Sequence, residues 1–337
     1  MRVAISGFGR IGKAFLRAAI AQGAFGKEID IVAINTRSPV EQHAHLFKYD
    51  SVYGRFGGKV EARDGNLFVN DHEIKWITET DPLKLPWKEM KIDLVLDSTG
   101  AFRSRSDAEK HLKAGAGLVL ISAPAKEVDA TIVPGVNDHV LNRGMKVLSL
   151  ASCTTNCLAP ILKVMDEKFG IETGFLSTVH AYTNDQNIVD GSHNDMRRAR
   201  AGALNIIPTS TGAAKAIGEV VRNLSGKMDG LAFRVPVSCG SMNDITLLLK
   251  RDASVSEINA ELRRASQEEL KGILGYSDEE LVSSDVIGTR ESSIVDSKLT
   301  KAQGKLVKIC AWYDNEFGYS NRLVDLVRKL SAMNKTG

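Results

Sequence analysis

The sequence predicts an α/β protein of two domains: a doubly wound parallel sheet, followed by an α+β domain with a mostly antiparallel or mixed sheet. Three observations support this prediction. The length of 337 residues suits about two domains. The 43% of hydrophobic and 25% of charged residues are typical of a globular protein. Strand-like and helix-like patterns alternate before about residue 150, and longer alternating strands follow it.

The composition excludes several classes of protein. Lys and Arg number 44 and Asp and Glu 41, so the net charge is only +3, which indicates no dedicated nucleic-acid partner. The longest apolar runs, such as residues 92–96, are too short to span a bilayer, and the N-terminus lacks a signal-peptide pattern. The four cysteines are then expected to be reduced thiols. We therefore expect a cytoplasmic protein with no membrane partner.

The first half of the chain reads as strands separated by helices. A strand at 3–6 leads into a helix at 11–21, whose apolar residues recur at helical spacing and which Gly23 is suited to end. Further strands are predicted at 29–35, 92–97, 118–122, 131–133 and 147–150. This alternation predicts a parallel sheet with right-handed crossovers.

The second half reads differently. A helix is predicted at 158–169, where Gly170 stops it. The later strands are predicted at 174–182, 231–237, 244–250 and 306–312, and the later helices at 255–270 and 320–333. Long β-branched strands with few helices between them favour a mostly antiparallel or mixed sheet.

A glycine motif lies between the first strand and the first helix. Gly7, Gly9 and Gly12 form G-x-G-x-x-G in the strand-to-helix context that gives this motif its meaning. Glycines allow a tight turn and a close approach of the backbone to a pyrophosphate, and the helix N-terminus attracts the anion. The alternative is a glycine-rich turn without a ligand. We predict a dinucleotide-binding Rossmann domain.

The end of the second strand bears on the choice of dinucleotide. An acidic residue that binds the ribose 2′-hydroxyl is usual there, but this chain has Asn35, Thr36, Arg37 and Ser38. Hydroxyl donors and a guanidinium suit a 2′-phosphate, which a carboxylate would repel. We therefore predict NADP as the preferred cofactor, with NAD possible. The alternative is that Arg37 is a solvated loop charge.

One cysteine is a candidate nucleophile. Cys153 follows an apolar strand and opens an apolar helix, where the helix dipole favours the thiolate and lowers its pKa. Ser152 and Thr154 flank it as hydroxyl donors or helix caps. His180, at the end of the next strand, is the best-placed candidate base, although a structural role is the alternative. The cysteine spacing matches no zinc motif, so no metal site is predicted.

Several segments are suited to bind anions. Residues 193–200 contain three arginines, and residues 207–215 place hydroxyls and a glycine before an alanine-rich helix. Arg234 lies inside an apolar strand and needs a partner there. A solvated face or a salt-bridge cluster is the alternative. Together with a dinucleotide site and a thiol, these features suggest the oxidation of a phosphorylated aldehyde.

Seven segments give the chain a family resemblance. They are GFGRIG, HLFKYDSVYGRF, ISAPAK, ASCTTNCLAP, HAYTNDQ, RRARAGALNIIPTSTGAAKA and WYDNEFGYS. Over essentially its whole length the chain resembles the class I phosphorylating glyceraldehyde-3-phosphate dehydrogenases. The resemblance implies a dinucleotide-binding domain over residues 1–150 and 317–337, a catalytic domain over 151–316, and a homotetramer.

The resemblance also implies a mechanism. Cys153 attacks glyceraldehyde 3-phosphate with His180 as base, hydride passes to the cofactor, and inorganic phosphate releases 1,3-bisphosphoglycerate from a thioester. The implied phosphate-binding residues are Thr183 and Arg234 for the substrate, and Ser152, Thr154, Arg198, Thr211 and Gly212 for inorganic phosphate. The implied cofactor-binding residues are Arg10, Ile11, Thr99, Ser122 and Asn315, beside those of the glycine motif and the second strand end.

Departures from the family pattern also bear on the cofactor. Thr36 replaces the Asp of NAD-specific members, and Ser192 replaces a Pro in a loop that lies near a cofactor in the family's tetramer. Both resemble NADP-using members. Thr80 stands where many members have an arginine near the adenine, so adenine contacts are expected to differ.

Two other functions are compatible with the sequence. An erythrose-4-phosphate dehydrogenase would share the fold and the nucleophile. A non-catalytic dinucleotide sensor, or an RNA-binding role of the arginine-rich loop at 197–200, would belong to another class. The presence of both Cys153 and His180 favours an enzyme over a sensor. Both the glycolytic and the gluconeogenic direction fit the sequence.

Overall fold

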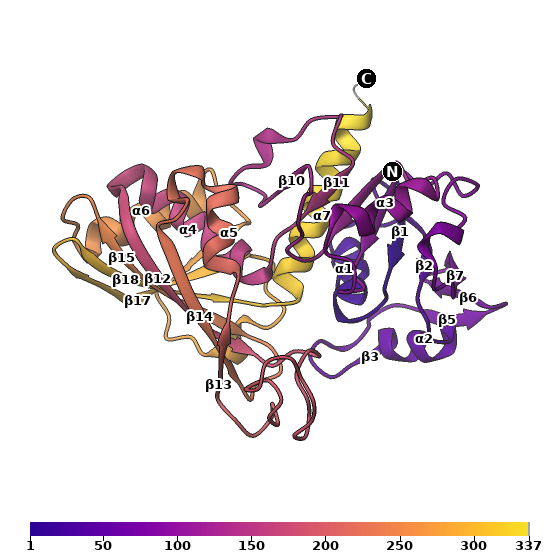
Figure 1. Ribbon diagram of the computed structural model, residues 1–337, viewed down its shortest axis with the longest axis horizontal. Helices are drawn as coiled ribbons and strands as arrows, with labels where there is room; N and C mark the ends of the chain where they lie inside the picture. The colour runs from indigo at the N-terminus through magenta and orange to yellow at the C-terminus, as the bar shows by residue number, and fades with distance from the viewer. Residues whose placement is uncertain (336–337) are drawn as a thin grey trace. The chain divides into compact units, whose positions relative to one another are not determined.

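The computed structural model describes residues 1–335, which form two compact units, each built around its own sheet (Figure 1). The first unit contains Met1–Ile132, His139–Ala151 and the chain from Ser320 onward. The second contains Val133–Asp138 and Ser152–Tyr319. In residues 1–335, no helix combines the length and the apolar character that crossing a bilayer requires.

The first unit holds a nine-stranded sheet in the order β10-β11-β9-β8-β1-β2-β7-β6-β5. Its strands are β1 (Arg2–Ser6), β2 (Asp30–Asn35), β5 (Val60–Arg63), β6 (Asn66–Val69), β7 (His72–Ile77), β8 (Leu94–Asp97), β9 (Leu118–Ile121), β10 (Ala130–Thr131) and β11 (Val147–Ser149). All pairs from β10 to β7 are parallel, and β7-β6-β5 is antiparallel. The chain runs outward in both directions from the central β1, so the predicted doubly wound sheet is confirmed.

The helices of the first unit begin and end where local chemistry dictates. They are α1 (Arg10–Ala21), α2 (Val40–Lys48), α3 (Arg105–Lys113) and, shared with the second unit, α7 (Phe317–Lys335), with a short pair β3 (Tyr49–Asp50) and β4 (Gly54–Arg55) after α2. After α1, Gly23 adopts a left-handed φ of +65°, which favours glycine. Two side-chain bonds connect α7 to the start of the unit: Gln22 Nε2 donates to Asn321 Oδ1 at 2.9 Å, and Arg328 pairs with Glu28 at 3.0 Å.

The antiparallel edge β5-β6-β7 was not anticipated. Its strands have only four to six residues, and charged or polar side chains interrupt β5 and β7, so these two lack the apolar runs that marked the other strands. The turn signals were present, because Asp64-Gly65 and Asn70-Asp71 all adopt positive φ, as a type I′ hairpin requires. Helix α3 also lacked a signal, since only Ala108 and His111 are buried in it.

The second unit holds a seven-stranded sheet in the order β13-β14-β12-β15-β18-β17-β16. Its strands are β12 (Ile171–Ala181), β13 (Ile207–Ser210), β14 (Met228–Val235), β15 (Ser241–Leu249), β16 (Leu274–Ser277), β17 (Ser293–Gln303) and β18 (Leu306–Tyr313). The pairs β12-β14 and β16-β17 are parallel and the others antiparallel. The predicted mixed sheet is therefore confirmed.

Three helices complete the second unit: α4 (Cys153–Phe169), α5 (Ala213–Val220) and α6 (Val255–Gln267). Helix α4 packs against β15, β17 and β18 and against α5 and α6, and most of its residues are buried. Every second residue of β15 is buried, as expected for a strand with one face covered. The N-terminus of α4 is fixed by Ser152, whose Oγ accepts a bond from Thr155 N at 3.0 Å.

Candidate active site

The glycine motif forms a cradle between β1 and α1. Gly7 has a φ of +89°, and a Cβ there would lie 2.6 Å from Thr99 N. A Cβ on Gly12 would lie 2.5 Å from Gly7 O, so both positions need glycine. Gly9, the N-cap of α1, makes no side-chain cap bond and has open space where its Cβ would be. The N–H groups in the first turn of a helix have no partner within the helix, so the start of α1 suits a dinucleotide pyrophosphate.

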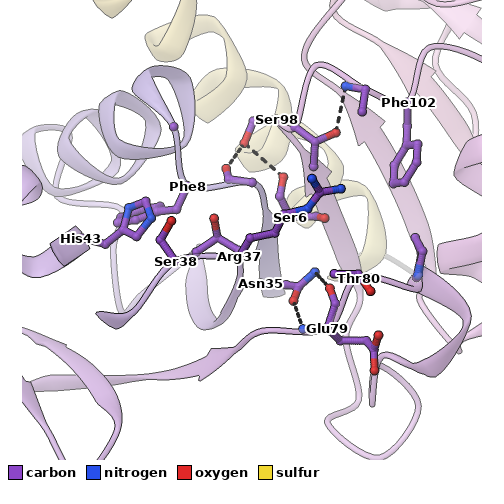
Figure 2. A pocket seen from close by; sticks show the side chains of 16 residues that line it. Ser6, Phe8, Asn35, Arg37, Ser38, His43, Glu79, Thr80, Ser98 and Phe102 are labelled. Carbon is purple, nitrogen blue, oxygen red and sulfur yellow. Dashed lines mark hydrogen bonds between the residues drawn. The ribbon is translucent and has the colours of Figure 1, made fainter. Parts of the chain in front are cut away.

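A pocket of about 410 Å³ opens beside this cradle (Figure 2). Such a volume lies within the usual range of ligand sites. The predicted cofactor residues that line it are Gly7, Gly9, Asn35, Thr36, Arg37 and Thr99, together with Thr80. The predicted residues Arg10, Ile11, Gly12 and Ser122 do not line it. Ser192 and Asn315 belong to the second unit.

The two charged residues that line this pocket, Arg37 and Glu79, differ in their surroundings. Asn35 Nδ2 donates to Glu79 O, and Asn35 Oδ1 accepts from Glu79 N, both at 3.0 Å (Figure 2). Asn35 therefore fastens the loop that carries Glu79 to the end of β2. Arg37 is exposed, and no group in residues 1–335 pairs with its guanidinium. An anion at this end of the pocket would meet an uncompensated positive charge.

In the second unit, the structure brings the candidate nucleophile and base together. Cys153 is the first residue of α4 and is half-buried, and His180 lies at the end of β12 with only 4% of its surface exposed. Cys153 Sγ lies 3.4 Å from His180 Nε2. This distance allows a proton to pass directly from the thiol to the imidazole.

The hydrogen bonds of His180 fix its tautomer. Nδ1 lies 2.7 Å from the carbonyl oxygen of Ala181, which can only accept. The proton of a neutral imidazole is therefore on Nδ1, and the lone pair of Nε2 faces Cys153. Arg234 Nη1 lies 3.2 Å from Nδ1 and donates to Ala181 O and Thr183 Oγ1, both at 3.1 Å. His180 is thus held as a proton acceptor for the thiol.

Burial keeps both groups neutral. It raises the pKa of the Cys153 thiol, against the opposing effects of the Arg234 charge and of hydrogen bonds from Thr154. Burial, followed by the Arg234 charge, lowers the pKa of His180 to about 3. The expected lowering of the thiol pKa at the helix N-terminus is therefore outweighed by desolvation. Deprotonation of Cys153 is then best coupled to proton transfer onto His180.

The register of the sheet explains the position of Arg234. Parallel pairing of β12 with β14 sets His180 directly beside Arg234. The Nε atom of Arg234 is buried and has no hydrogen-bond partner among residues 1–335. A buried donor without a partner is costly, so this atom is suited to an anionic ligand. The structure thus groups Arg234 and Thr183, the two residues predicted for one phosphate.

The residues predicted for the second phosphate have more protein partners. Arg198 donates from Nε to Thr209 Oγ1 at 2.9 Å and from Nη1 to Asp185. Thr211 Oγ1 accepts from Ala213 N at 3.2 Å, and the exposed Gly212 is the N-cap of α5. The oxygens of Ser152 and Thr155 lie 2.8 Å apart, so the Ser152 hydroxyl is mainly a helix cap.

Thr154 belongs to a buried network that the sequence did not reveal. Its Oγ1 lies 3.0 Å from Tyr313 OH, which lies 2.9 Å from Thr178 Oγ1. The Tyr313 ring meets His180 edge to face, with ring centroids 6.0 Å apart. One sequence pattern could have indicated that Tyr313 points into the core: side chains alternate between the two faces along β18, so every second one faces the same side.

Ser241 is a second residue that sequence reasoning missed. It lies opposite Tyr313 in the pairing of β15 with β18. Its Oγ accepts from Ala181 N at 3.1 Å and lies 2.9 Å from Asn315 Oδ1, to which it donates. With Oδ1 as the acceptor, the Asn315 amide NH₂ has no hydrogen-bond partner within residues 1–335 and can face a ligand. In residues 1–335, no three His, Cys, Asp or Glu side chains gather as metal ligands would.

Comparisons with known proteins agree with this geometry. The family model described as glyceraldehyde 3-phosphate dehydrogenase, NAD binding domain, matches residues 1–105, and the C-terminal domain model of the same family matches residues 152–315. The glyceraldehyde-3-phosphate dehydrogenase of Borreliella burgdorferi is 54% identical over 98% of this chain and 99% of its own. Those of Thermotoga maritima (53% identical, 98% of this chain and 99% of that protein) and Streptomyces coelicolor (52%, 97% of each) are similarly related.

Proposed function

Because the chain belongs to the glyceraldehyde-3-phosphate dehydrogenase family, we propose that it catalyses the reversible, phosphorylating oxidation of glyceraldehyde 3-phosphate to 1,3-bisphosphoglycerate. The observation that carries this proposal is the 3.4 Å approach of Cys153 Sγ to His180 Nε2, with Nδ1 bonded to Ala181 O. A neutral thiol beside an imidazole lone pair is suited to nucleophilic catalysis at a carbonyl.

The reaction follows from this pair. The thiol proton passes to His180 Nε2 as Cys153 Sγ forms a bond to the aldehyde carbon, and His180 returns this proton to the former carbonyl oxygen, which gives a thiohemiacetal and a neutral imidazole. His180 then takes the hydroxyl proton as the carbon loses hydride and becomes a thioester. A bound nicotinamide dinucleotide would supply the hydride acceptor. An oxygen of inorganic phosphate attacks the thioester, and the C–S bond breaks to release the acyl phosphate. The departing Cys153 Sγ takes the proton from His180 Nε2, which restores the neutral thiol and the neutral imidazole.

Two anion sites serve the two phosphates of this reaction. Arg234 and Thr183 would hold the substrate phosphate, which agrees with the buried, partnerless Nε of Arg234. Arg198, Thr211 and Gly212 would hold inorganic phosphate at the N-terminus of α5. Ser152 and Thr154 would contribute through the backbone at the start of α4.

The first unit would be the dinucleotide-binding domain and the second the catalytic domain, as the sequence predicts for residues 1–150 with 317–337 and for 151–316. NADP is the proposed preferred cofactor. Arg37 supports this proposal, because it lines the pocket without a protein partner in residues 1–335 and no carboxylate occupies position 36. The family resemblance also assigns Ser192 and Asn315 to cofactor binding, and we keep this assignment as part of the proposal.

A homotetramer in the cytoplasm is the proposed working form. Five large apolar side chains of the second unit, all between residues 188 and 206, are 69–85% exposed; they are Ile188, Val189, Met196, Leu204 and Ile206. Exposed apolar residues gathered in one segment are typical of an interface. Light scattering after size exclusion should give a mass of several subunits, and a monomer would contradict the proposal.

Steady-state kinetics test the activity. With glyceraldehyde 3-phosphate and inorganic phosphate, the protein should reduce NADP⁺, and Cys153→Ser should abolish turnover while dinucleotide binding is retained. Cys157→Ser is the matched control, since Cys157 is fully buried one helical turn away and is not assigned to the chemistry. Undiminished turnover of Cys153→Ser, or a higher kcat/KM with erythrose 4-phosphate, would contradict the proposal.

A second experiment tests the cofactor. The double variant Thr36→Asp with Arg37→Leu should shift the ratio of kcat/KM from NADP towards NAD by about tenfold or more, since a charge-assisted hydrogen bond contributes roughly 1.5–3 kcal/mol. The parent protein provides the reference ratio. If the parent already prefers NAD, then Arg37 is a solvated loop charge and the NADP proposal is wrong.

A further inference from the structure

A buried polar chain lies behind the wall of the first-unit pocket. Trp87 and His111 are fully buried and Asp97 is 2% exposed, and none of the three lines the pocket. Trp87 Nε1 donates to His111 Nδ1 at 3.0 Å, and His111 Nε2 lies 3.4 Å from Asp97 Oδ2. In residues 1–335, neither of these last two atoms has a hydrogen-bond partner of good geometry, so each is the nearest polar group that the other is shown to contact. This row of three polar side chains therefore extends without a branch from the core to the end of β8.

The Trp87 indole, the donor at one end of this row of side chains, determines which nitrogen of His111 carries the proton. An indole N–H can only donate, so His111 Nδ1 accepts and the proton of the neutral ring is on Nε2. That N–H lies on the nitrogen that is 3.4 Å from Asp97 Oδ2, where its positive end is attracted to the carboxylate. Without the indole donor, the proton could move to Nδ1, and a lone pair on Nε2 would face Asp97 Oδ2. Trp87 thus determines whether the contact between His111 and Asp97 is attractive.

The far end of the chain reaches the pocket wall. Asp97 Oδ1 accepts from Thr99 Oγ1 at 2.7 Å and from Thr99 N at 3.0 Å. The Thr99 hydroxyl accepts in turn from Ala101 N at 3.1 Å, and both Thr99 and Ala101 line the pocket. Phe102, also a lining residue (Figure 2), meets the His111 ring edge to face, with ring centroids 6.1 Å apart.

The same loop supports the glycine cradle. Ser98 Oγ donates to Gly7 O at 2.6 Å (Figure 2), and the backbone of Thr99 lies against Gly7 so closely that a Cβ there would be 2.6 Å from Thr99 N. A shift of Thr99 would therefore move the surface on which the pyrophosphate is proposed to rest. The loop is set by Asp97, and Asp97 is set by His111.

We propose that Trp87, His111 and Asp97 are positioning residues for the dinucleotide, because they hold Thr99 and the loop at 97–102 in the geometry that the pocket requires. The inference rests on the proposed dinucleotide-binding function and extends it to residues that touch no ligand. An apolar core of the same volume would be easier to stabilise than a buried carboxylate and imidazole. We therefore infer that these three polar side chains position the loop at 97–102 and contribute little to the stability of the fold.

The test is the variant Trp87→Phe, which removes the indole donor and keeps an aromatic ring in the core. The dissociation constant for NADP(H) should rise about five- to tenfold, the equivalent of one net hydrogen bond. The KM for glyceraldehyde 3-phosphate, whose proposed contacts lie in the second unit, should stay unchanged. Ile92→Val, a truncation in the same apolar cluster as Trp87, is the control for general loosening and should leave dinucleotide affinity unchanged.

A double-mutant cycle separates positioning from packing. Thr99→Val removes the hydroxyl bond to Asp97 Oδ1 and keeps the bond from Thr99 N, so Trp87→Phe should have a smaller effect on affinity in that background than in the parent protein. Equal effects in the two backgrounds, or unchanged affinity in Trp87→Phe, would overturn the inference. If Trp87→Phe does not fold, His111→Leu interrupts the chain at its middle and is judged by the same criteria. Failure of the parent protein to bind NADP(H) or NAD(H) would instead refute the proposed function.

Discussion

The hydroxyl of Tyr313 is the central atom of the buried network beside the nucleophile, and Tyr313→Phe removes this atom alone. Tyr313 is fully buried, so no solvent molecule is available to replace its bonds to Thr154 Oγ1 at 3.0 Å and Thr178 Oγ1 at 2.9 Å. Within the described part of the chain, residues 1–335, Thr178 Oγ1 then keeps only a long contact of 3.5 Å with Met242 O. The substitution therefore leaves two buried hydroxyls with weakened hydrogen bonding.

The cost follows from these two bonds. Each buried hydrogen bond contributes about 1 kcal/mol net, and a buried hydroxyl left without a partner costs about 1–3 kcal/mol. Because the two threonine hydroxyls can rotate towards other acceptors, we expect the free energy of unfolding to fall by about 2–3 kcal/mol. The aromatic contact with His180 is retained, so packing should contribute little to this loss.

Urea denaturation measures this difference. The matched control is Tyr182→Phe, because the Tyr182 side chain is 38% exposed and its loss of a hydroxyl should change stability by less than about 0.5 kcal/mol. Combining Tyr313→Phe with Thr178→Val should cost less than the sum of the single variants, since both break one bond. A loss below about 0.5 kcal/mol for Tyr313→Phe, or full additivity, would refute the network.

Three further predictions concern other parts of the chain. Ser241→Ala should free Asn315 to rotate and raise the dinucleotide KM about tenfold, with kcat little changed, in steady-state assays. Burial, then Arg10, lowers the pKa of Lys13 from 10.5 to about 8, so the unfolded chain binds more protons between these pH values and stability should rise across that window. Denaturation of Lys13→Met at the two ends of the window should lack this rise. Asp314→Ala removes acceptors for Glu316 N at 2.8 Å and Phe317 N at 2.7 Å at the start of α7, and calorimetry should record a loss of about 1–3 kcal/mol.

The parts of the fold that the sequence predicts are those with a local cause. The turn at Gly7 and the end of α1 at Gly23 both need positive φ, and glycine provides it at each point. The parallel strands are apolar runs because both of their faces are buried. In the edge β5-β6-β7 the apolar run is limited to three residues of β6, so the sequence did not predict this edge despite the paired positive φ at Asp64 and Gly65.

The candidate site was predictable residue by residue but not in its pairings. The sequence analysis selected Cys153 and His180 because reactive side chains are often located at helix N-termini and at the ends of strands. Their neighbour Arg234 is 54 residues from His180, and only the register of β12 with β14 brings the two together. The direction of the Cys153 pKa also depends on burial, which sequence patterns do not measure. Long-range pairing and desolvation are properties of the folded chain.

The three arginines assigned to phosphates from the sequence are not equivalent in the fold. Arg198 is held by Asp185 and Thr209, so its charge is partly compensated and its orientation is already fixed. Arg234 is oriented by Ala181 and Thr183 while its Nε has no partner in residues 1–335.

Arg37 is exposed and carries no such restraint in that part of the chain, so a phosphate there must order a flexible side chain in water. Anchoring by Arg234 should therefore be the strongest of the three and least sensitive to salt. Discrimination by Arg37 should weaken as ionic strength rises. Cofactor preference measured at low salt would then overstate the contribution of Arg37, whereas the KM for the aldehyde should change little.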